Sequence, residues 1–151
     1  MNTSMDIPIK VLSVRQPWAH AIIHGTGQGW KDVENRSWST AYHGPLFIHA
    51  GLSKSEMPIA KDIGYAGDEP FCFGRIIGVV DLLDCVDSEV PPGPQVYGES
   101  QWAGWGSDYY WLLSNPRPLD DPIPCKGALG LFTPSDSEIV RKLRHILAPK
   151  I

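Results

Sequence analysis

The chain has 151 residues, of which 42% are hydrophobic and 20% charged, and its formal net charge is -4. Its length is close to that of one ordinary domain and its composition is that of a globular protein, so we predict a single domain over residues 1–151 and exclude disorder. The acidic balance excludes a broad nucleic-acid surface, because such a surface needs Lys and Arg to neutralise phosphates. Any nucleic-acid site must therefore be local.

Cysteine usage and hydropathy bear on where the protein resides. Cys72, Cys85 and Cys125 are odd in number and lack the close pairing of zinc ligands, so we predict reduced, structural thiols. No apolar run approaches the roughly 20 residues of a membrane span, and MNTSMDIPIK has no basic-then-apolar secretory pattern. We predict a cytoplasmic protein without a membrane partner.

The first predicted elements are a strand over residues 8–14 and a short helix from Pro17 to about Gly25, since proline is tolerated in the first turn of a helix. The segment GTGQG then predicts a loop. Further strands are predicted at 31–38, 45–50, 74–85, 109–113 and 128–132. The run from Ile76 to Leu83 is apolar on both sides, which is typical of a central strand covered on both faces.

Two more helices are predicted from capping signals. Ser53 with Glu56 fits a capping box, and Ser135 with Glu138 repeats it before EIVRKLRHIL. That second segment carries one apolar stripe, which predicts an amphipathic C-terminal helix over about 135–148 that packs on the sheet.

Residues 86–107, between the predicted strands 74–85 and 109–113, are too rich in Pro and Gly for a regular element. They carry Tyr97, Trp102 and Trp105, so this loop is either a packed lid or a recognition segment. Five or more strands with few helices indicate a small mixed β-barrel.

Four stretches together, LSVRQPWAHAIIHG, KDVENRSW, GPLFIHAG and YYWLLSNPRPLDDPIPCKGALGLF, resemble the ASCH domain family, the activating signal cointegrator homology domain of the PUA-like superfamily. The match runs from about residue 11 to 132. The resemblance implies an α+β fold, a small mixed β-barrel (PUA-like pseudo-barrel) with helices at its openings. It also implies a cleft near the first helix that binds RNA or nucleotide-like ligands.

The family resemblance implies three alternative functions. The first is RNA binding with ribonuclease activity, stimulated by a divalent metal such as Mn or Mg. The second is a non-catalytic module that binds RNA or a protein partner. The third is an amidohydrolase acting on modified nucleosides such as acetylated cytidine.

Two departures from the family pattern bear on these alternatives. TGQGW separates the end of the first helix from KDVENR, where the family spacing is nearly direct. In the small amidohydrolases a Lys is followed three residues later by a Thr nucleophile, and the matching positions here are Lys31 and Glu34. A carboxylate does not replace a hydroxyl nucleophile, which weakens the amidohydrolase alternative.

The segment KDVENRSW is the first candidate site. In a regular strand Glu34 and Arg36 share one face, and Lys31 joins them only if a bulge follows the glycine-rich loop. A carboxylate beside a guanidinium keeps both charged, and the guanidinium suits a phosphate or a base edge. The alternative is a surface ion pair worth under ~1 kcal/mol; the resemblance favours the cleft.

Other candidates flank the predicted cleft. Arg15 and Gln16 precede the first helix and either form an anion pocket with its N–H groups or, for Gln16, tie the loop to the barrel. His49 is either an acid–base group or a buried histidine satisfied by backbone. Ser53 and Lys54 either hold a phosphate or are a cap and a solvated cation.

Aromatic residues offer base-stacking surfaces, which need little net charge. Tyr109 and Trp111 share one predicted strand face, and Trp18 is either a core residue or a stacking platform. Trp38, with Trp30 and Trp105, is predicted near the same mouth. For RNA hydrolysis, Arg36 and Lys54 hold phosphate while Glu34, Lys31 or His49 handles protons.

A metal site is not predicted from the residues themselves. His20 and His24 have the one-turn spacing of paired ligands but lack a third ligand nearby, which favours solvent-facing histidines. Asp81 and Asp84 suit Mg²⁺ or Mn²⁺ only if the fold brings further ligands to them.

Overall fold

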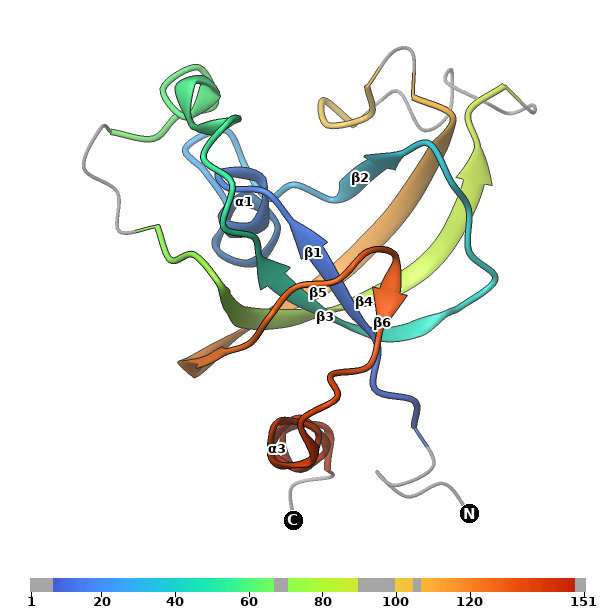
Figure 1. The fold of residues 1–151 in the computed structure, drawn as a ribbon. Helices are drawn as coiled ribbons and strands as arrows, with labels where there is room; N and C mark the ends of the chain where they lie inside the picture. The colour runs from blue at the N-terminus through green and yellow to red at the C-terminus, as the bar shows by residue number, and fades with distance from the viewer. Residues whose placement is uncertain (1–6, 67–70, 90–99, 105–106, 149–151) are drawn as a thin grey trace.

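The computed structural model describes residues 7–66, 71–89, 100–104 and 107–148. Six strands form one strongly curled sheet in the order β2-β5-β4-β3-β1-β6, and it wraps into a half-barrel (Figure 1). β1 and β3 pair in parallel, and every other neighbouring pair is antiparallel. The strands are β1 (Val11–Val14), β2 (Val33–Arg36), β3 (Gly44–Ala50), β4 (Arg75–Asp87), β5 (Tyr109–Pro124) and β6 (Leu131–Phe132).

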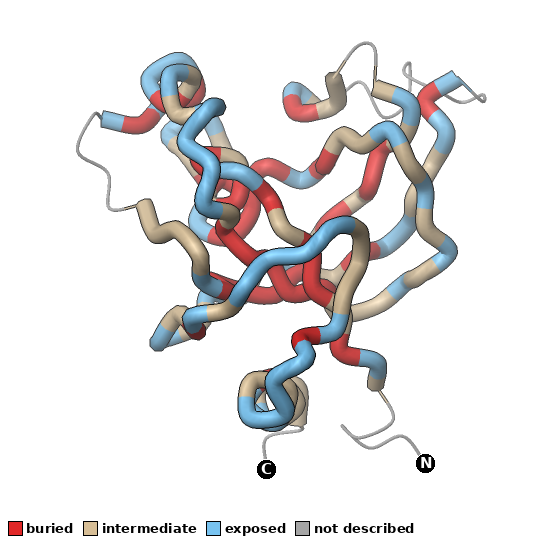
Figure 2. Tube along the Cα trace, viewed as in Figure 1, coloured by how far each residue is buried: buried red, intermediate tan, exposed pale blue. Residues whose placement is uncertain are grey.

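β4 is the central strand, as predicted, and its first half is covered on both faces. Ile77 and Val80 belong to one core cluster, and Ile76 and Val79 belong to another on the opposite side. Figure 2 shows the buried residues concentrated in this middle part of the sheet. The prediction fails at its end, because Leu83 is 57% exposed where β4 runs out beyond the core.

The inner face of the half-barrel is covered by helix α1 (Trp18–His24). Its buried residues Ala19, Ile22 and Ile23 join a core cluster with Leu12, Leu46 and Trp111. Because this apolar packing fills one opening of the half-barrel, it fixes the start of α1 next to the ends of β1 and β3.

The outer face is covered by helix α3 (Ser137–Leu147), which lies below the sheet in Figure 1. Leu143 is fully buried, and Ile139, Val140, Ile146 and Leu147 pack partly buried around it, which confirms the predicted stripe. The predicted cap is wrong by one residue: Asp136, not Ser135, is the N-cap, and its carboxylate accepts from the Glu138 backbone N–H at 2.9 Å.

Other predicted boundaries differ from the observed ones. The Ser53–Glu56 capping box does not exist; the only helical turn of that segment is the 3₁₀ helix η1 (Met57–Ile59), because Pro58 and a poor apolar face support nothing longer. β5 extends far past residue 113 to Pro124. The predicted strand 31–38 shortens to β2, and much of 86–107, including Tyr97 and Trp105, lies outside the described residues.

The structure bears on the predictions about the cysteines and about membrane-spanning helices. Cys72, Cys85 and Cys125 are free thiols, and each is half-buried. Among the described residues, no helix is long and apolar enough to cross a membrane.

Candidate functional site

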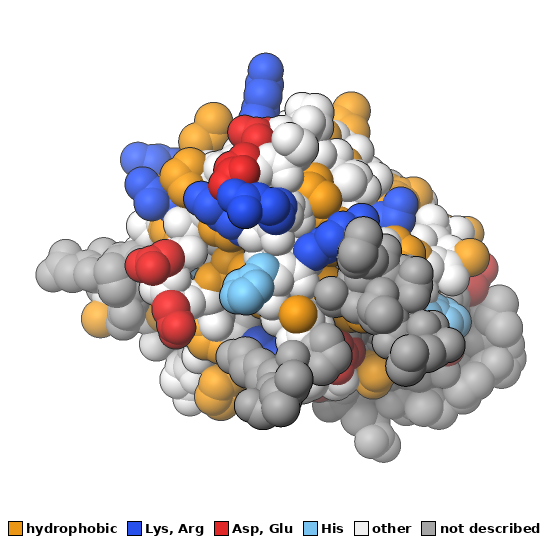
Figure 3. All heavy atoms as spheres, turned by 90° about the horizontal axis from the view of Figure 1, so that it is seen from below, with side chains coloured by type: hydrophobic (Ala, Val, Ile, Leu, Met, Phe, Trp, Pro, Cys, Tyr) orange, Lys and Arg blue, Asp and Glu red, His pale blue; other side chains and the backbone are white. Residues whose placement is uncertain are grey.

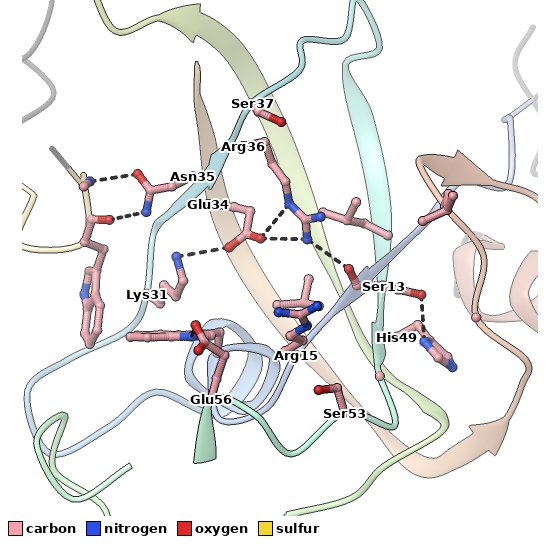
Figure 4. Close-up of a pocket in the computed structure, with 18 of the residues that line it drawn as sticks. Ser13, Arg15, Lys31, Glu34, Asn35, Arg36, Ser37, His49, Ser53 and Glu56 are labelled. Carbon is pink, nitrogen blue, oxygen red and sulfur yellow. Dashed lines mark hydrogen bonds and ion pairs between the residues drawn. The ribbon is translucent and has the colours of Figure 1, made fainter. Parts of the chain in front are cut away.

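A large pocket lies at the seam of the half-barrel, where the β2 edge of the curled sheet faces β1. Its cavity volume is about 1260 Å³. The Arg36 side chain bridges the seam, because its Nη2 donates to the Ser13 carbonyl at 2.9 Å (Figure 4). Residues that line the pocket include Ser13, Arg15, Trp18, Lys31, Glu34, Asn35, Arg36, Trp38, His49, Ser53, Glu56, Trp102, Lys126 and Gly127.

Lys31, Glu34 and Arg36 form one ion cluster on the pocket floor. Glu34 Oε1 lies 3.2 Å from Lys31 Nζ. Glu34 Oε2 accepts a hydrogen bond from Arg36 Nε at 2.8 Å and forms an ion pair with Arg36 Nη2 at 2.8 Å. Lys31 is 4% exposed and Glu34 7% exposed, so water screens their attraction poorly. One carboxylate serves two cations, which leaves this cluster with a net positive charge directed at the pocket.

Lys31 reaches the cluster by a different route from the predicted bulge. No register shift interrupts β2–β5 pairing, and the strand begins only at Val33. The Lys31 backbone N–H instead donates to the Ala21 carbonyl at 3.1 Å, at the open end of α1. This bond turns the residue inward before the strand begins, and Lys31 Nζ also donates to the Val33 carbonyl.

The inserted TGQGW segment is a tight turn fastened to α1. Thr26 and Gly29 pair with each other as an isolated bridge, and the Trp30 indole N–H donates to the Ile23 carbonyl at 3.2 Å. Gly25 has φ 77°, and a Cβ there would lie 2.8 Å from the Trp30 ring, so only glycine lets this ring pack. Trp30 is 54% exposed but does not line the pocket, contrary to prediction.

Asn35 connects the pocket floor to the pocket wall. Its Nδ2 donates to the Trp102 carbonyl and its Oδ1 accepts from the Gly104 N–H, each at 2.8 Å. The segment 100–104 is also held by a hydrogen bond from Ser100 Oγ to the Asp32 carboxylate at 2.5 Å. These bonds seat Trp102 edge-on against Trp18, with ring centroids 6.5 Å apart.

Arg15 and Gln16, which come just before α1, lie in different environments. Arg15 is exposed and lines the pocket, as predicted. Gln16 is fully buried: its Oε1 accepts from the His20 N–H at 2.8 Å and its Nε2 donates to the Cys72 carbonyl at 2.9 Å. Gln16 therefore ties the loop to the barrel, and the backbone N–H groups of Ala19, His20 and Ala21 in the first turn donate to partners within the chain.

The predicted aromatic residues also separate into two groups. Trp18 and Trp38 are half-buried and line the pocket. Trp111 is 0% exposed, its ring is 4.8 Å from that of Trp38, and its indole donates to the Trp38 carbonyl at 3.2 Å. It is a core residue and cannot stack on a base. Tyr109 is half-buried opposite Arg36 on the β2–β5 pair but does not line the pocket.

The residues after β3 contribute less than predicted. Ser53 lines the pocket, but its Oγ accepts from the Ser55 N–H at 3.2 Å in a local turn and caps no helix. Lys54 does not line the pocket; its ammonium lies 5.1 Å from the centroid of the Phe73 ring. Without a helix N-terminus here, the predicted phosphate contact of Lys54 loses its structural basis.

His49 is 2% exposed and has partners on both ring nitrogens. Nε2 lies 2.6 Å from the Cys125 carbonyl, and Nδ1 lies 2.9 Å from Ser13 Oγ. Burial lowers the pKa of His49, although the Cys125 carbonyl acts in the opposite direction. The alternative of a histidine held by backbone therefore accounts for one nitrogen only. Sequence reasoning missed Ser13; its signal was a single polar residue inside an apolar strand.

The proposed metal ligands do not converge. The rings of His20 and His24 stack at 4.4 Å, and burial, then the charge of His24, lowers the pKa of His20 to about 4. His20 is half-buried against Tyr65 and Phe71, which corrects the solvent-facing prediction. Asp81 is engaged by Arg117 at 3.1 Å.

The donor set of the described residues does not suit a divalent ion. Among them, no group of three or more His, Cys, Asp or Glu side chains comes together. We therefore derive no catalytic step through the Mn or Mg that the family resemblance implies.

The pocket differs in charge from the chain as a whole. Among the described residues that line it, four are cationic (Arg15, Lys31, Arg36 and Lys126) and two are carboxylates (Glu34 and Glu56), whereas the whole chain has a net charge of -4. The face that carries α3 shows Lys and Arg side chains with Asp and Glu among them (Figure 3). The excess of cations over carboxylates in the pocket is therefore opposite in sign to the net charge of the chain.

Comparison with known proteins identifies the family. No family model matches the chain. Human activating signal cointegrator 1 is 32% identical over 130 residues, which cover 77% of this chain and 20% of that protein; the mouse protein is 31% identical with the same coverage. The chain thus spans about a fifth of the length of these curated relatives.

Solved structures share the fold. The crystal structure of ASCH from Zymomonas mobilis has a TM-score of 0.57 and 20% identity, covering 93% of this chain and 96% of that one. A point variant of that protein gives the same TM-score and identity and is covered to 98%. These likenesses show the fold, an α+β pseudo-barrel. With the motifs, the relatives and the fold in agreement, the chain belongs to the ASCH domain family.

Proposed function

We propose that the chain binds RNA, or a nucleotide carrying a modified nucleoside, in the seam pocket. The observation that carries this proposal is the excess of positive charge in the pocket of an acidic chain. Phosphate groups dominate the affinity of nucleic-acid sites, and a local cluster of cations is enough for a short single strand.

Arg36 and Arg15 are the proposed phosphate contacts. Glu34 Oε2 holds the Arg36 guanidinium by a hydrogen bond from Nε and an ion pair with Nη2, and the Ser13 carbonyl holds it from the other side of the seam. The planar fork is thereby oriented before a ligand arrives, which reduces the entropy lost on binding. Trp18 and Trp38 are the proposed stacking surfaces, since both line the pocket and are partly exposed.

The test is fluorescence anisotropy with a labelled single-stranded RNA at low and moderate salt. Arg15→Ala should weaken binding by about tenfold and lower the salt dependence by about one phosphate contact. Arg117→Ala is the matched control, because Arg117 lies on β5 outside the pocket. Equal losses in both variants, or no binding by the wild type at low salt, would refute a pocket-based RNA site.

Catalytic turnover is a finer proposal for the same pocket. Ribonuclease activity requires a proton-transfer group, and Lys31, Glu34 and His49 are the candidates. Incubation of RNA with the wild type and Glu34→Gln tests Glu34: cleavage lost only in the variant supports its role, while equal cleavage removes it. Absence of cleavage with intact binding supports the non-catalytic module, which binds RNA or a protein partner.

The amidohydrolase alternative has the weakest structural support. Glu34 occupies the position of the family's hydroxyl nucleophile, and its carboxylate is ion-paired with Lys31 at 3.2 Å. A paired carboxylate at this position orients cations and offers no hydroxyl for acyl transfer. Incubation with acetylated cytidine, followed by chromatography, should therefore show no release of acetate that depends on Lys31 or Glu34.

A further inference from the structure

A serine and a histidine face each other on the pocket side of β1 and β3, apart from the ion cluster. Ser13 and His49 are register partners in this parallel strand pair, so the sheet itself sets their side chains side by side (Figure 4). Ser13 Oγ lies 2.9 Å from His49 Nδ1, and both residues line the pocket. The arrangement is therefore fixed by backbone pairing and opens on the cavity.

The hydrogen-bond partners determine which nitrogen of His49 carries the proton. The Cys125 carbonyl, 2.6 Å from Nε2, only accepts, so Nε2 must donate. Nδ1 of the neutral ring then holds a lone pair and accepts from the Ser13 hydroxyl. The Cys125 position is itself fixed, because its N–H donates to the Gly74 carbonyl at 3.1 Å. A hydroxyl, a basic nitrogen and an orienting carbonyl thus stand in series.

The surroundings match those of a nucleophile and its base. A β-bulge interrupts the β3–β4 pairing at His49, and bulges are common where a side chain is aimed at a site. Gly127 lies over the pair: a Cβ there would come 2.9 Å from Ser13 Oγ and 3.0 Å from His49 Cε1. Burial favours the neutral imidazole, which is the form that accepts a proton.

We propose that Ser13 is a nucleophile activated by His49, and that this dyad catalyses hydrolysis of acyl esters, with anionic esters preferred. A hydroxyl bonded to a basic nitrogen whose other nitrogen is oriented by an acceptor is the arrangement that acyl transfer requires. The preference for negative charge follows from Arg36, whose guanidinium donates to the carbonyl of Ser13 itself. This activity is independent of the proposed RNA binding.

The reaction proceeds in two balanced steps. Ser13 Oγ forms a bond to the ester carbonyl carbon while its proton moves to His49 Nδ1, and that proton then passes to the departing alcohol as the C–O bond breaks. The oxygen of water next forms a bond to the acyl carbon while water gives a proton to Nδ1. The bond between that carbon and Ser13 Oγ then breaks, Oγ takes the proton from Nδ1, and the carboxylic acid leaves. Water is the only co-reactant.

The first experiment treats the full chain with a fluorophosphonate and measures the intact mass, followed by peptide mapping. One adduct on Ser13 is expected in the wild type, with at least a tenfold slower reaction in His49→Gln and no adduct at that position in Ser13→Ala. Ser37→Ala is the matched control, since Ser37 also lines the pocket but is exposed and outside the dyad. An unlabelled Ser13 in the folded wild type would overturn the proposal.

A second measurement separates nucleophilicity from a structural role of the hydrogen bond. In Ser13→Cys, alkylation of the introduced thiol by iodoacetamide at pH 6.5 should be at least tenfold faster than in Ser13→Cys/His49→Gln, because a neighbouring base generates the thiolate. Peptide mapping distinguishes this thiol from the three native ones. Equal rates in the two variants would overturn the proposal.

Turnover completes the test. The nitrophenyl monoester of succinic acid should be hydrolysed faster than nitrophenyl acetate, and both activities should fall at least tenfold in Ser13→Ala while Ser37→Ala retains them. Loss of RNA binding in Arg15→Ala with unchanged labelling of Ser13 would leave this proposal standing. Hydrolysis that persists in Ser13→Ala would contradict it.

Discussion

Two of the carboxylate–guanidinium pairs among the described residues have the same chemistry and different surroundings. Glu34 and Arg36 meet at 2.8 Å in the pocket, with side chains 9% and 23% exposed. Asp81 and Arg117 meet at 3.1 Å between β4 and β5, with side chains 36% and 37% exposed. The first pair is joined by a second cation, Lys31, and the second pair is joined by the neutral amide of Asn115.

The comparison shows that burial and the third partner, more than pairing itself, make an ion pair a functional candidate. A pair open to water gains little from its attraction and is screened by salt. A buried pair is costly to break because removing one charge leaves the other without water or partner. The buried cluster thus holds an excess positive charge at a fixed position, and the open pair adds little to two strands that already pair through their backbones.

The largest expected effect is that of Glu34→Gln. The substitution keeps the shape but strands Lys31 and Arg36 without a counter-charge, so it should lower the free energy of unfolding by about 3–5 kcal/mol. Urea denaturation followed by Trp fluorescence measures this change. A loss below about 1 kcal/mol would show that water reaches the cluster and would erase its contrast with the Asp81–Arg117 pair.

Asn35→Ala should have the next largest effect, because it acts on the wall that encloses the buried pair. It leaves the Trp102 carbonyl and the Gly104 N–H without their partners, which should cost about 1–3 kcal/mol. Amide hydrogen exchange should speed up in residues 100–104, and RNA affinity should fall because the wall beside the pocket loosens.

The matched control for Asn35 is Asn115→Gly. Glycine is chosen because Asn115 has φ 53°, where alanine would be strained. Asn115 is exposed, and its amide donates to Asp81 at 3.1 Å. The control should leave exchange in 100–104 and RNA affinity unchanged; an equal effect of the two substitutions would mean that the wall is not held by Asn35.

Lys31→Met should have a smaller effect than Glu34→Gln, although Lys31 is the more buried of the two. Glu34 keeps Arg36 as its partner, and methionine fills most of the volume of the lysine stem, so we expect about 1 kcal/mol from the lost hydrogen bond to the Val33 carbonyl. Thermal and urea unfolding measure it. A cost equal to that of Glu34→Gln would show that Arg36 alone does not balance the charge of Glu34.

Much of the fold followed from the sequence because apolar periodicity reports burial. The apolar run of β4 and the apolar stripe of α3 predicted where these two elements lie. The four family motifs predicted the barrel-like fold. The predicted boundaries of helices and strands were wrong where local signals were weak. Ser53 and Glu56 match a capping box, but Pro58 and a short apolar face allow only a 3₁₀ turn. The length of β5 was hidden by its prolines, which normally interrupt strands.

The candidate site was harder to predict because its geometry depends on tertiary contacts. Glu34 and Arg36 are two residues apart, so their pairing follows from strand periodicity. Lys31 enters the pocket through a backbone bond to Ala21, and no local pattern announces such a bond. Strand periodicity predicts which face of the strand carries Trp111, and this led to the prediction of a stacking residue. Periodicity does not predict its 0% exposure, which follows from the sheet curling around it.

The smallest expected effect is that of Asp81→Asn, the counterpart of Glu34→Gln. The amide oxygen still accepts from Arg117, both side chains are about a third exposed, and water replaces the lost charge, so the free energy of unfolding should fall by less than about 1 kcal/mol. The loss should shrink further in 1 M salt, where the Debye length is about 3 Å. RNA affinity should not change. A loss of several kcal/mol would mean that exposure does not distinguish the two pairs, and the distinction would then rest on the second cation alone.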